Sequence, residues 1–226
     1  MAEKKIKRNA IKIAMLGDSM VGKTAICNTF MNIEFNDNNL STIGMEKLES
    51  QITLKNGEEI KFIIWDTAGQ ERFRSIALKS IKTAQGVVIV FDLTQKRTFL
   101  NVVNWLKEIN EKLNNVCIVL FGNKCDIDEN KWEVSKDEIM KFVEKNGLTY
   151  FETSAKEDIN IKEGFKNVVN AAYEKYEGTT SGIQLDKNIE TKKNQNAVEV
   201  EKQREKRKKQ IRKRKYKLNT FIFYLV

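Results

Sequence analysis

Histidine is absent from the 226 residues of this chain. Its absence excludes a Ser-His-Asp triad, a histidine-based zinc site and a histidine general base. No apolar run comes close to the roughly 20 residues that span a bilayer. The first residues contain neither the apolar stretch of a secretory signal nor a glycine at position 2 that could accept myristate. We therefore expect a protein without a membrane span, a secretory signal or N-terminal myristate.

Cysteine is scarce, with Cys27, Cys117 and Cys125 as the only three. Their odd number and their spacing do not suit a metal site, so we expect free thiols in a reducing compartment, the cytoplasm. Because Cys125 is the last cysteine, the sequence predicts no prenylation near Val226.

The net charge of +9 belongs to the C-terminal end of the chain. Residues 178–226 contain 14 Lys or Arg and 5 Asp or Glu, a difference of +9, whereas residues 1–177 contain 26 of each sign. The excess of positive charge therefore lies in the tail, and it does not support nucleic-acid binding by the rest of the chain.

Short apolar runs alternate with amphipathic segments up to residue 177. Such runs are typical of strands buried in a parallel sheet, and an Asn-Gly pair at 56–57 favours a hairpin turn. Ser135 and Glu138 predict a capping box. The predicted strands are 11–16, 46–54, 59–65, 87–91 and 116–121. The predicted helices are 25–31, 99–113, 135–146 and 161–176. This alternation predicts a three-layer α/β fold that binds its ligand at the carboxyl ends of the strands.

A change of composition at residues 178–182 marks a domain boundary. The stretch that follows has too few apolar residues to bury a core. We expect a short N-terminal extension (1–9), a globular domain (10–177) and a basic, disordered tail with an apolar end (178–226).

Residues 17–24 read Gly-Asp-Ser-Met-Val-Gly-Lys-Thr and fit the phosphate-loop pattern G-x-x-x-x-G-K-[ST]. The loop lies between a predicted strand and a predicted helix, which argues against an accidental match. Its backbone N–H groups and the helix N-terminus bind phosphate, Lys23 reaches the β- and γ-phosphates, and the Thr24 hydroxyl binds Mg²⁺. The expected nucleotide contacts are Gly17, Asp18, Ser19, Met20, Val21, Gly22, Lys23, Thr24 and Ala25.

A second motif, Trp-Asp-Thr-Ala-Gly-Gln-Glu at 65–71, follows a predicted strand. Asp66 at the end of that strand suits Mg²⁺ bound through its water shell. Gly69 lets a backbone N–H approach the γ-phosphate, and Gln70 orients the attacking water. Alone, this segment could be an ordinary loop with a hydrogen-bonded Asp. Together with the phosphate loop, it predicts a magnesium site.

Two further motifs predict recognition of guanine. Residues 123–126 are Asn-Lys-Cys-Asp, in which the Asp126 carboxylate pairs with guanine N1–H and the exocyclic amine, and adenine lacks this pattern. Residues 152–156 follow the last strand and are Glu-Thr-Ser-Ala-Lys. Each motif alone also suits a plain turn, but their order along the chain is specific. The expected base contacts are Asn123, Lys124 along the base plane, Asp126, Ser154, Ala155 through its N–H to guanine O6, and Lys156.

These motifs, with residues 65–74, resemble the small GTPases of the Ras superfamily and are most similar to its Rab branch. The resemblance covers residues 10–177. It implies a mixed six-stranded sheet with helices on both faces, a GTPase domain, and a monomer that cycles between GDP and GTP with Mg²⁺. It also implies slow hydrolysis by Gln70, Lys23 and Thr42, and a switch role in vesicle traffic. Thr42, in switch I, binds Mg²⁺ and the γ-phosphate, and Phe35 stacks on the guanine.

Effector proteins that contact switch I and switch II (69–82), an exchange factor and a GTPase-activating protein are the implied partners. The sequence departs from the Rab pattern in both switches, where Met45-Glu46-Lys47 and Ser80-Ile81 replace the usual residues. The effector-binding triad becomes Lys47, Trp65 and Ser80, with one aromatic instead of three, which weakens the expectation of the usual effectors. Met20 stands where a smaller residue is usual and leaves the hydrolysis rate open.

The tail combines a basic run at 202–217 with an apolar end at 221–226. It suits a solvated, disordered segment, a peripheral contact with an anionic membrane, or, as a minor alternative, nuclear import or nucleic-acid contact. Two rival functions stay open. One is a binding module locked on its nucleotide, which Gln70 argues against. The other is a nucleic-acid-binding protein, which the lack of aromatics among the basic residues disfavours.

Overall fold

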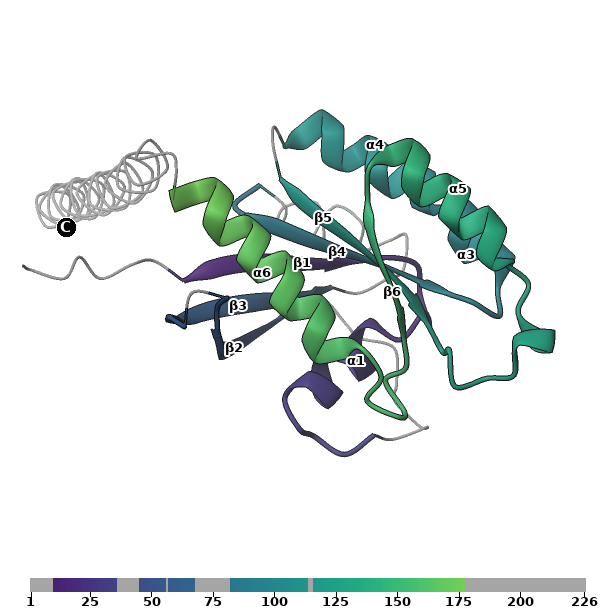
Figure 1. The fold of residues 1–226 in the computed structure, drawn as a ribbon, viewed down its shortest axis with the longest axis horizontal. Helices are drawn as coiled ribbons and strands as arrows, with labels where there is room; N and C mark the ends of the chain where they lie inside the picture. Colours follow the sequence, from purple (N-terminus) through teal and green to yellow (C-terminus); the bar gives the residue numbers. More distant parts are fainter. Residues whose placement is uncertain (1–9, 36–44, 56, 68–81, 114–115, 178–226) are drawn as a thin grey trace, which may run out of the picture. The chain divides into compact units, whose positions relative to one another are not determined.

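The computed structural model describes residues 10–35, 45–55, 57–67, 82–113 and 116–177. They form a six-stranded sheet in the order β2-β3-β1-β4-β5-β6 (Figure 1). Strand β2 runs antiparallel to β3, and the other four pairings are parallel. The strands are β1 (Ile11–Leu16), β2 (Met45–Thr53), β3 (Glu59–Thr67), β4 (Gly86–Asp92), β5 (Cys117–Asn123) and β6 (Thr149–Thr153). The predicted mixed six-stranded α/β fold is confirmed.

Helices pack on both faces of this sheet (Figure 1). Along β1, Ile13 and Met15 belong to one core cluster and Ala14 and Leu16 to a second, as the alternation of side chains in a strand requires. Helices α1 and α6 cover the first cluster, and α3, α4 and α5 cover the second. The helices are α1 (Lys23–Phe30), α3 (Lys96–Leu100), α4 (Val102–Lys112), the 3₁₀ turn η2 (Glu129–Lys131), α5 (Lys136–Asn146) and α6 (Ile161–Glu177).

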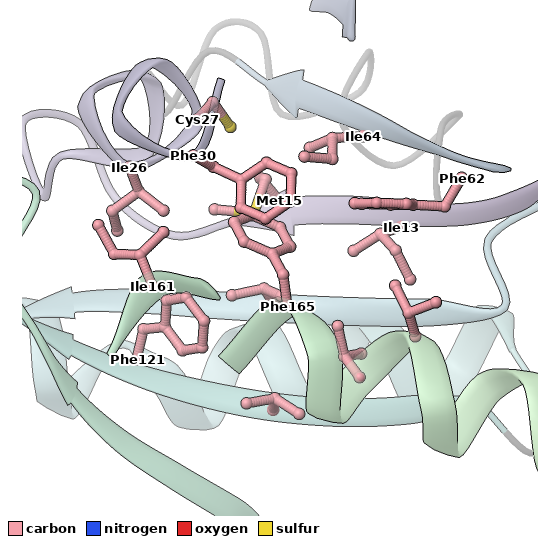
Figure 2. Close-up of a cluster of buried hydrophobic side chains, with 14 of the residues drawn as sticks. Ile13, Met15, Ile26, Cys27, Phe30, Phe62, Ile64, Phe121, Ile161 and Phe165 are labelled. Carbon is pink, nitrogen blue, oxygen red and sulfur yellow. The ribbon is translucent and has the colours of Figure 1, made fainter. Parts of the chain in front are cut away.

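Aromatic rings dominate the core beneath α1 and α6 (Figure 2). Phe30 of α1 and Phe165 of α6 lie with their ring centroids 4.6 Å apart. Phe62 and Phe121 bring in β3 and β5, and both are fully buried. Four elements therefore meet at these rings, and Phe30 packs α1 against the sheet and α6.

Two sequence predictions about helices are tested directly. The capping box is present: Ser135 Oγ accepts from the Glu138 N–H, and the Glu138 carboxylate accepts from the Ser135 N–H. The helix predicted at 99–113 begins earlier, at Lys96, and divides at Asn101. Its first turn is polar, so the apolar periodicity does not reveal where the helix begins.

The turn between β2 and β3 is fastened to α6. The Lys55 N–H donates to Asn170 Oδ1 over 3.0 Å, and the Tyr173 hydroxyl donates to the Glu58 carboxylate over 2.7 Å. Gly57 has a φ of 82°, in the left-handed region that favours glycine in a hairpin turn. The predicted hairpin is therefore confirmed, and it is joined to the last helix.

The three cysteines are free thiols, as predicted. Burial raises the pKa of each thiol. In the described part of the chain, no helix is both long and apolar enough to cross a membrane. Several predictions fall outside the described residues: the segments 1–9 and 178–226, switch I with Thr42, Gly69, Gln70, Ser80 and Ile81.

Candidate functional site

Residues 17–22 link the carboxyl end of β1 to the start of α1, where the sequence predicts a phosphate loop. Gly17 has a φ of 139°, and a Cβ there would lie 2.2 Å from the Val90 carbonyl oxygen. Gly22 has a φ of 97°, and a Cβ there would lie 2.3 Å from Asn123 Nδ2. Both positions therefore require glycine for their backbone conformation and for the close approach of the loop to β4 and β5.

Lys23 is the first residue of α1, and its side chain turns back under this loop. The residue is 5 % exposed, and its Nζ donates to the carbonyl oxygens of Gly17 (3.0 Å) and Asp18 (2.7 Å). Burial lowers the pKa of Lys23 to about 8, against the attraction of Asp66 and Asp18. An ammonium group has three donors. The two carbonyls take two of them, and the loop is curled around a buried positive charge.

The Thr24 hydroxyl and the Asp66 carboxylate meet beside Lys23. Thr24 Oγ1 donates to Asp66 Oδ2 over 2.6 Å, and Asp66 is 1 % exposed. Burial raises the pKa of Asp66, and the hydrogen bond from Thr24 opposes this shift. Within the described residues, the buried Asp66 Oδ1 has no hydrogen-bond partner. A buried carboxylate oxygen needs a cation, a donor or water, and hydroxyl and carboxylate oxygens are what Mg²⁺ prefers. The predicted pair Thr24 and Asp66 fits Mg²⁺.

The same ranges contain no group of three or more His, Cys, Asp or Glu that could hold a metal. Mg²⁺ usually takes only one or two carboxylates from the protein and completes its shell with water and substrate phosphates. The absence of a larger acidic cluster in the described residues is therefore compatible with Mg²⁺ at the Thr24–Asp66 pair.

Asn123, at the end of β5, connects the base motif to the phosphate loop. It is 2 % exposed, and its Nδ2 donates to the Val21 carbonyl over 2.9 Å. Its Oδ1 accepts from Thr153 Oγ1 over 3.4 Å, so it also contacts β6. Asn123 thus ties together three segments that are distant in the sequence, and any base contact that it makes comes on top of this structural role.

The two motifs predicted to bind guanine lie side by side. Ser154 Oγ donates to Asp126 Oδ1 over 2.7 Å, which orients an otherwise exposed carboxylate. The Cys125 N–H donates to the Thr153 carbonyl over 3.1 Å. Ala155 is buried, and its carbonyl accepts from Thr29 Oγ1 of α1 over 2.6 Å. Hydrogen bonds therefore hold both motifs in fixed positions relative to α1.

Four predicted residues line the site's margin. Met20 is 65 % exposed and has a φ of 65°, which is uncommon for a residue with a side chain. Ser19 is half-buried and Lys156 is exposed. Phe35, the predicted guanine-stacking residue, is half-buried and packs against the core cluster at α1.

The structure adds Asp92, which the sequence analysis did not single out. Asp92 is fully buried at the carboxyl end of β4, and its Oδ2 lies 2.6 Å from Lys124 Nζ. The ammonium of Lys124, which we expected along a base plane, is therefore held by a carboxylate. A signal existed, because Asp92 ends an apolar strand in the same way as Asp66 does.

The side chain of Asp18 also has an unforeseen role. Its backbone was predicted to bind phosphate, but its Oδ1 accepts from Asn101 Nδ2 (2.5 Å) and from Trp105 Nε1 (3.1 Å). Asp18 thereby joins the phosphate loop to the junction of α3 and α4. No pattern in the sequence indicates this contact, because the partners are more than 80 positions apart.

Known proteins are similar to this chain over most of its length. The sequence profile of the Ras family matches residues 12–174. The chain is 38 % identical over 172 residues to Ras-related protein Rab-13 of Canis lupus familiaris, covering 76 % of this chain and 84 % of that protein. It is 41 % identical over 163 residues to Ras-related protein RABA5c of Arabidopsis thaliana, covering 72 % and 75 %. Rab-13 of Rattus norvegicus is 36 % identical over 191 residues, covering 82 % of this chain and 93 % of the relative.

Proposed function

We propose that residues 17–25 bind the phosphates of GDP and GTP and that residues 123–126 and 154–156 bind guanine, because this chain belongs to the Ras family of small GTPases. The chain is a Rab-like GTP hydrolase that cycles between GDP- and GTP-bound states with Mg²⁺ and acts in membrane and vesicle traffic. One observation carries the assignment of residues. The ends of β1, β3, β5 and β6 are joined by hydrogen bonds among the motif residues themselves.

Phosphate binding follows from the loop and the helix behind it. The third donor of the Lys23 ammonium is available for a phosphate oxygen once the Gly17 and Asp18 carbonyls have taken two. Gly22 is the N-cap of α1 and has no side chain, so no side-chain cap hydrogen bond competes with an anion at this end of the helix. Lys23 and the start of α1 together place positive potential at one point.

Thr24 and Asp66, with Thr42, would hold Mg²⁺. When bound, the ion neutralises charge on the phosphates. The Thr24–Asp66 hydrogen bond sets the two side chains together before any ligand arrives. This arrangement lowers the reorganisation that binding requires, because the two side chains are already adjacent.

Hydrolysis is assigned to Gln70, which lies outside the described residues, as does Gly69. Gln70→Leu is expected to lower the single-turnover rate of GTP hydrolysis tenfold or more and to leave GDP affinity nearly unchanged. The change removes the group that orients water and spares every phosphate and base contact. Rapid mixing of GTP-loaded protein with Mg²⁺, followed by phosphate release, measures the rate.

Gln51→Leu is the matched control for this prediction, because Gln51 is exposed on β2 and has no part in the proposed site. Its rate should equal that of the unmodified protein. Equal rates for Gln70→Leu and the unmodified protein would instead favour the alternative function, a binding module locked on its nucleotide.

Effectors, exchange factors and GTPase-activating proteins are the kinds of partner that Rab-family membership brings. We place the effector contacts on the switches and on the neighbouring β2–β3 face. There Lys47 stands opposite Trp65 in the strand register and is ion-paired with Glu49. A charged pair beside one aromatic should select different effectors from those of relatives with three aromatics. Ser80, the third member of the triad, lies outside the described residues.

We place the protein in the cytoplasm and propose that its tail makes weak, peripheral contact with anionic membranes. Deleting residues 202–226 is expected to reduce cosedimentation with anionic vesicles to the level seen with neutral vesicles. Each basic residue near an anionic surface contributes about 1 kcal/mol, and salt screens the contact beyond about 8 Å. The binding of the full chain should therefore also fall at high salt.

Deleting residues 221–226 alone is the companion variant for this test. It keeps the basic run and should keep most of the anionic preference. If the full chain binds neutral and anionic vesicles equally, the tail does not act through charge on membranes. Nuclear import, the minor alternative, would then be the next use of the basic run to examine.

A further inference from the structure

We propose that Asp92 is a positioning residue for nucleotide binding, which acts by holding the side chain of Lys124 in the base-binding part of the site. This inference rests on the proposed function of residues 123–126. It concerns a residue outside the motifs. An experiment can distinguish the role proposed for this residue from a role in stabilising the fold alone.

The sheet places Asp92 and Lys124 together. Asp92 ends β4 and is paired in register with Asn123, the last residue of β5. The Leu93 N–H donates to the Asn123 carbonyl over 3.1 Å, which continues the pairing for one more residue. Lys124 follows Asn123 at once, so its side chain begins next to the buried carboxylate.

The ion pair between Asp92 and Lys124 is partly buried. Asp92 is 0 % exposed, whereas the Lys124 side chain is 33 % exposed, so the contact lies at the boundary between the core and the site. A buried carboxylate is costly unless it is paired and hydrogen-bonded. The Lys124 ammonium, 2.6 Å from Oδ2, supplies the positive charge.

The remaining hydrogen bonds of Asp92 fix the direction of its carboxylate. Oδ1 accepts from the Thr94 N–H (2.9 Å) and from Thr94 Oγ1 (2.7 Å), and Oδ2 accepts from Gln95 Nε2 (3.3 Å). The turn after β4 therefore holds the Asp92 carboxylate in a fixed direction. As a result, the carboxylate can determine where the Lys124 ammonium lies.

The backbone of Lys124 is itself constrained. Its φ of 69° lies in the left-handed region, which residues with side chains occupy only where the surrounding structure fixes them. The neighbouring side chains of Asn123 and Asp126 are fixed by Val21 and Ser154. The Lys124 side chain is thus fixed at its backbone and at its ammonium, which Asp92 holds. Its aliphatic part between these two points suits a surface against which a flat base packs.

A simpler role is possible for Asp92, namely to cap the turn at Thr94 and Gln95. The two roles predict different results when Lys124 loses its charge. If Asp92 acts through the ammonium of Lys124, its replacement should have little further effect once that ammonium is gone. If it only caps the turn, the two changes should act independently.

The experiment compares Asp92→Asn, Lys124→Met and the double variant in the full chain with Mg²⁺. It measures the dissociation rate of fluorescent GDP chased by excess GDP. Each single change is expected to accelerate GDP release by about 10- to 100-fold, less than the loss of one partner of a fully buried charge pair would give, because the Lys124 side chain is 33 % exposed. The double variant should release GDP no faster than Lys124→Met. Thermal unfolding of each GDP-bound protein shows that the comparison is made on folded chains.

Two controls accompany this cycle. Thr94→Val removes a hydrogen bond of the turn and spares the ion pair, so GDP release should change less than threefold. Asp128→Asn alters a carboxylate that caps another turn, where it accepts from the Asn130 N–H over 2.9 Å, and it should leave release unchanged.

The possible outcomes are distinct. Unchanged release in Asp92→Asn, or a double variant whose acceleration is the product of the two single ones, would overturn the inference. Asp92→Asn and Thr94→Val with equal effects would also overturn it, because the turn would then explain both. The failure of the unmodified chain to bind GDP would refute the proposed function instead.

Discussion

Lys23→Met is expected to weaken GDP and GTP binding by about 100-fold or more. The substitution keeps an unbranched side chain one heavy atom shorter and removes the only charge that the described phosphate loop buries, 5 % exposed beneath Gly17 and Asp18. Losing one partner of a buried, hydrogen-bonded charge pair costs about 2–5 kcal/mol, and 2.7 kcal/mol corresponds to a factor of about 100. Equilibrium titration with fluorescent GDP measures the loss.

The stability of the nucleotide-free protein should change far less than its affinity for nucleotide. Burial already disfavours the charged form of Lys23, as its pKa of about 8 shows, so removing the charge relieves a desolvation penalty. The two carbonyls lose their donor, which acts in the opposite direction. We expect urea unfolding of the nucleotide-free variant to differ from the unmodified protein by less than about 2 kcal/mol.

Lys107→Met provides the reference for this comparison, because Lys107 is exposed on α4. It should alter neither affinity nor stability. A Lys23→Met protein that binds GDP as tightly as the unmodified chain would show that the loop does not bind phosphate through this ammonium.

Asp126→Asn is expected to shift preference from guanine to xanthine nucleotides by about three orders of magnitude. The Asp126 carboxylate accepts from two donors of guanine, whereas an amide can donate to the second carbonyl of xanthine. Sites built on such hydrogen bonds discriminate by about 10⁴–10⁵, and partial exposure of Asp126 reduces this range. Ser154 Oγ can still donate to the amide oxygen, so the side chain should keep its orientation.

Competition between GDP and xanthosine diphosphate for the labelled site measures the shift. The unmodified protein should also exclude ATP, because adenine offers no donor pair to Asp126. ATP that displaces GDP at comparable concentration would contradict the assignment of this residue. Asp128→Asn, in the same loop and also exposed, should keep the guanine preference.

Sequence patterns predicted the parts of the fold that depend on local periodicity. Apart from the helix predicted at 99–113, which begins earlier and divides, the predicted strands and helices lie within a few residues of the observed ones, and the capping box at Ser135 follows from two residues three positions apart. The motifs were also predicted to lie at the carboxyl ends of strands, since parallel pairing brings those ends to one edge. For the four motifs this placement holds wherever the chain is described.

The contacts between the motifs could not be predicted in the same way. Asn123 is predicted to contact the base, and the structure adds a hydrogen bond from its amide to the Val21 carbonyl that the sequence does not indicate. The side chain of Asp18 and the ammonium of Lys124 have partners on other strands and helices. Such pairings depend on how the elements pack in three dimensions, which spacing along one sequence does not record.

The fastening of α6 to the β2–β3 turn separates the end of the last helix from the nucleotide motifs. Asn170 and Tyr173 are hydrogen-bonded to the turn that precedes β3, whereas the nucleotide motifs follow the carboxyl ends of β1 and β3. The last turns of α6 therefore point away from the edge that carries the phosphate loop (Figure 1). The described domain therefore has its phosphate loop and the carboxyl end of its last helix at opposite ends of the sheet.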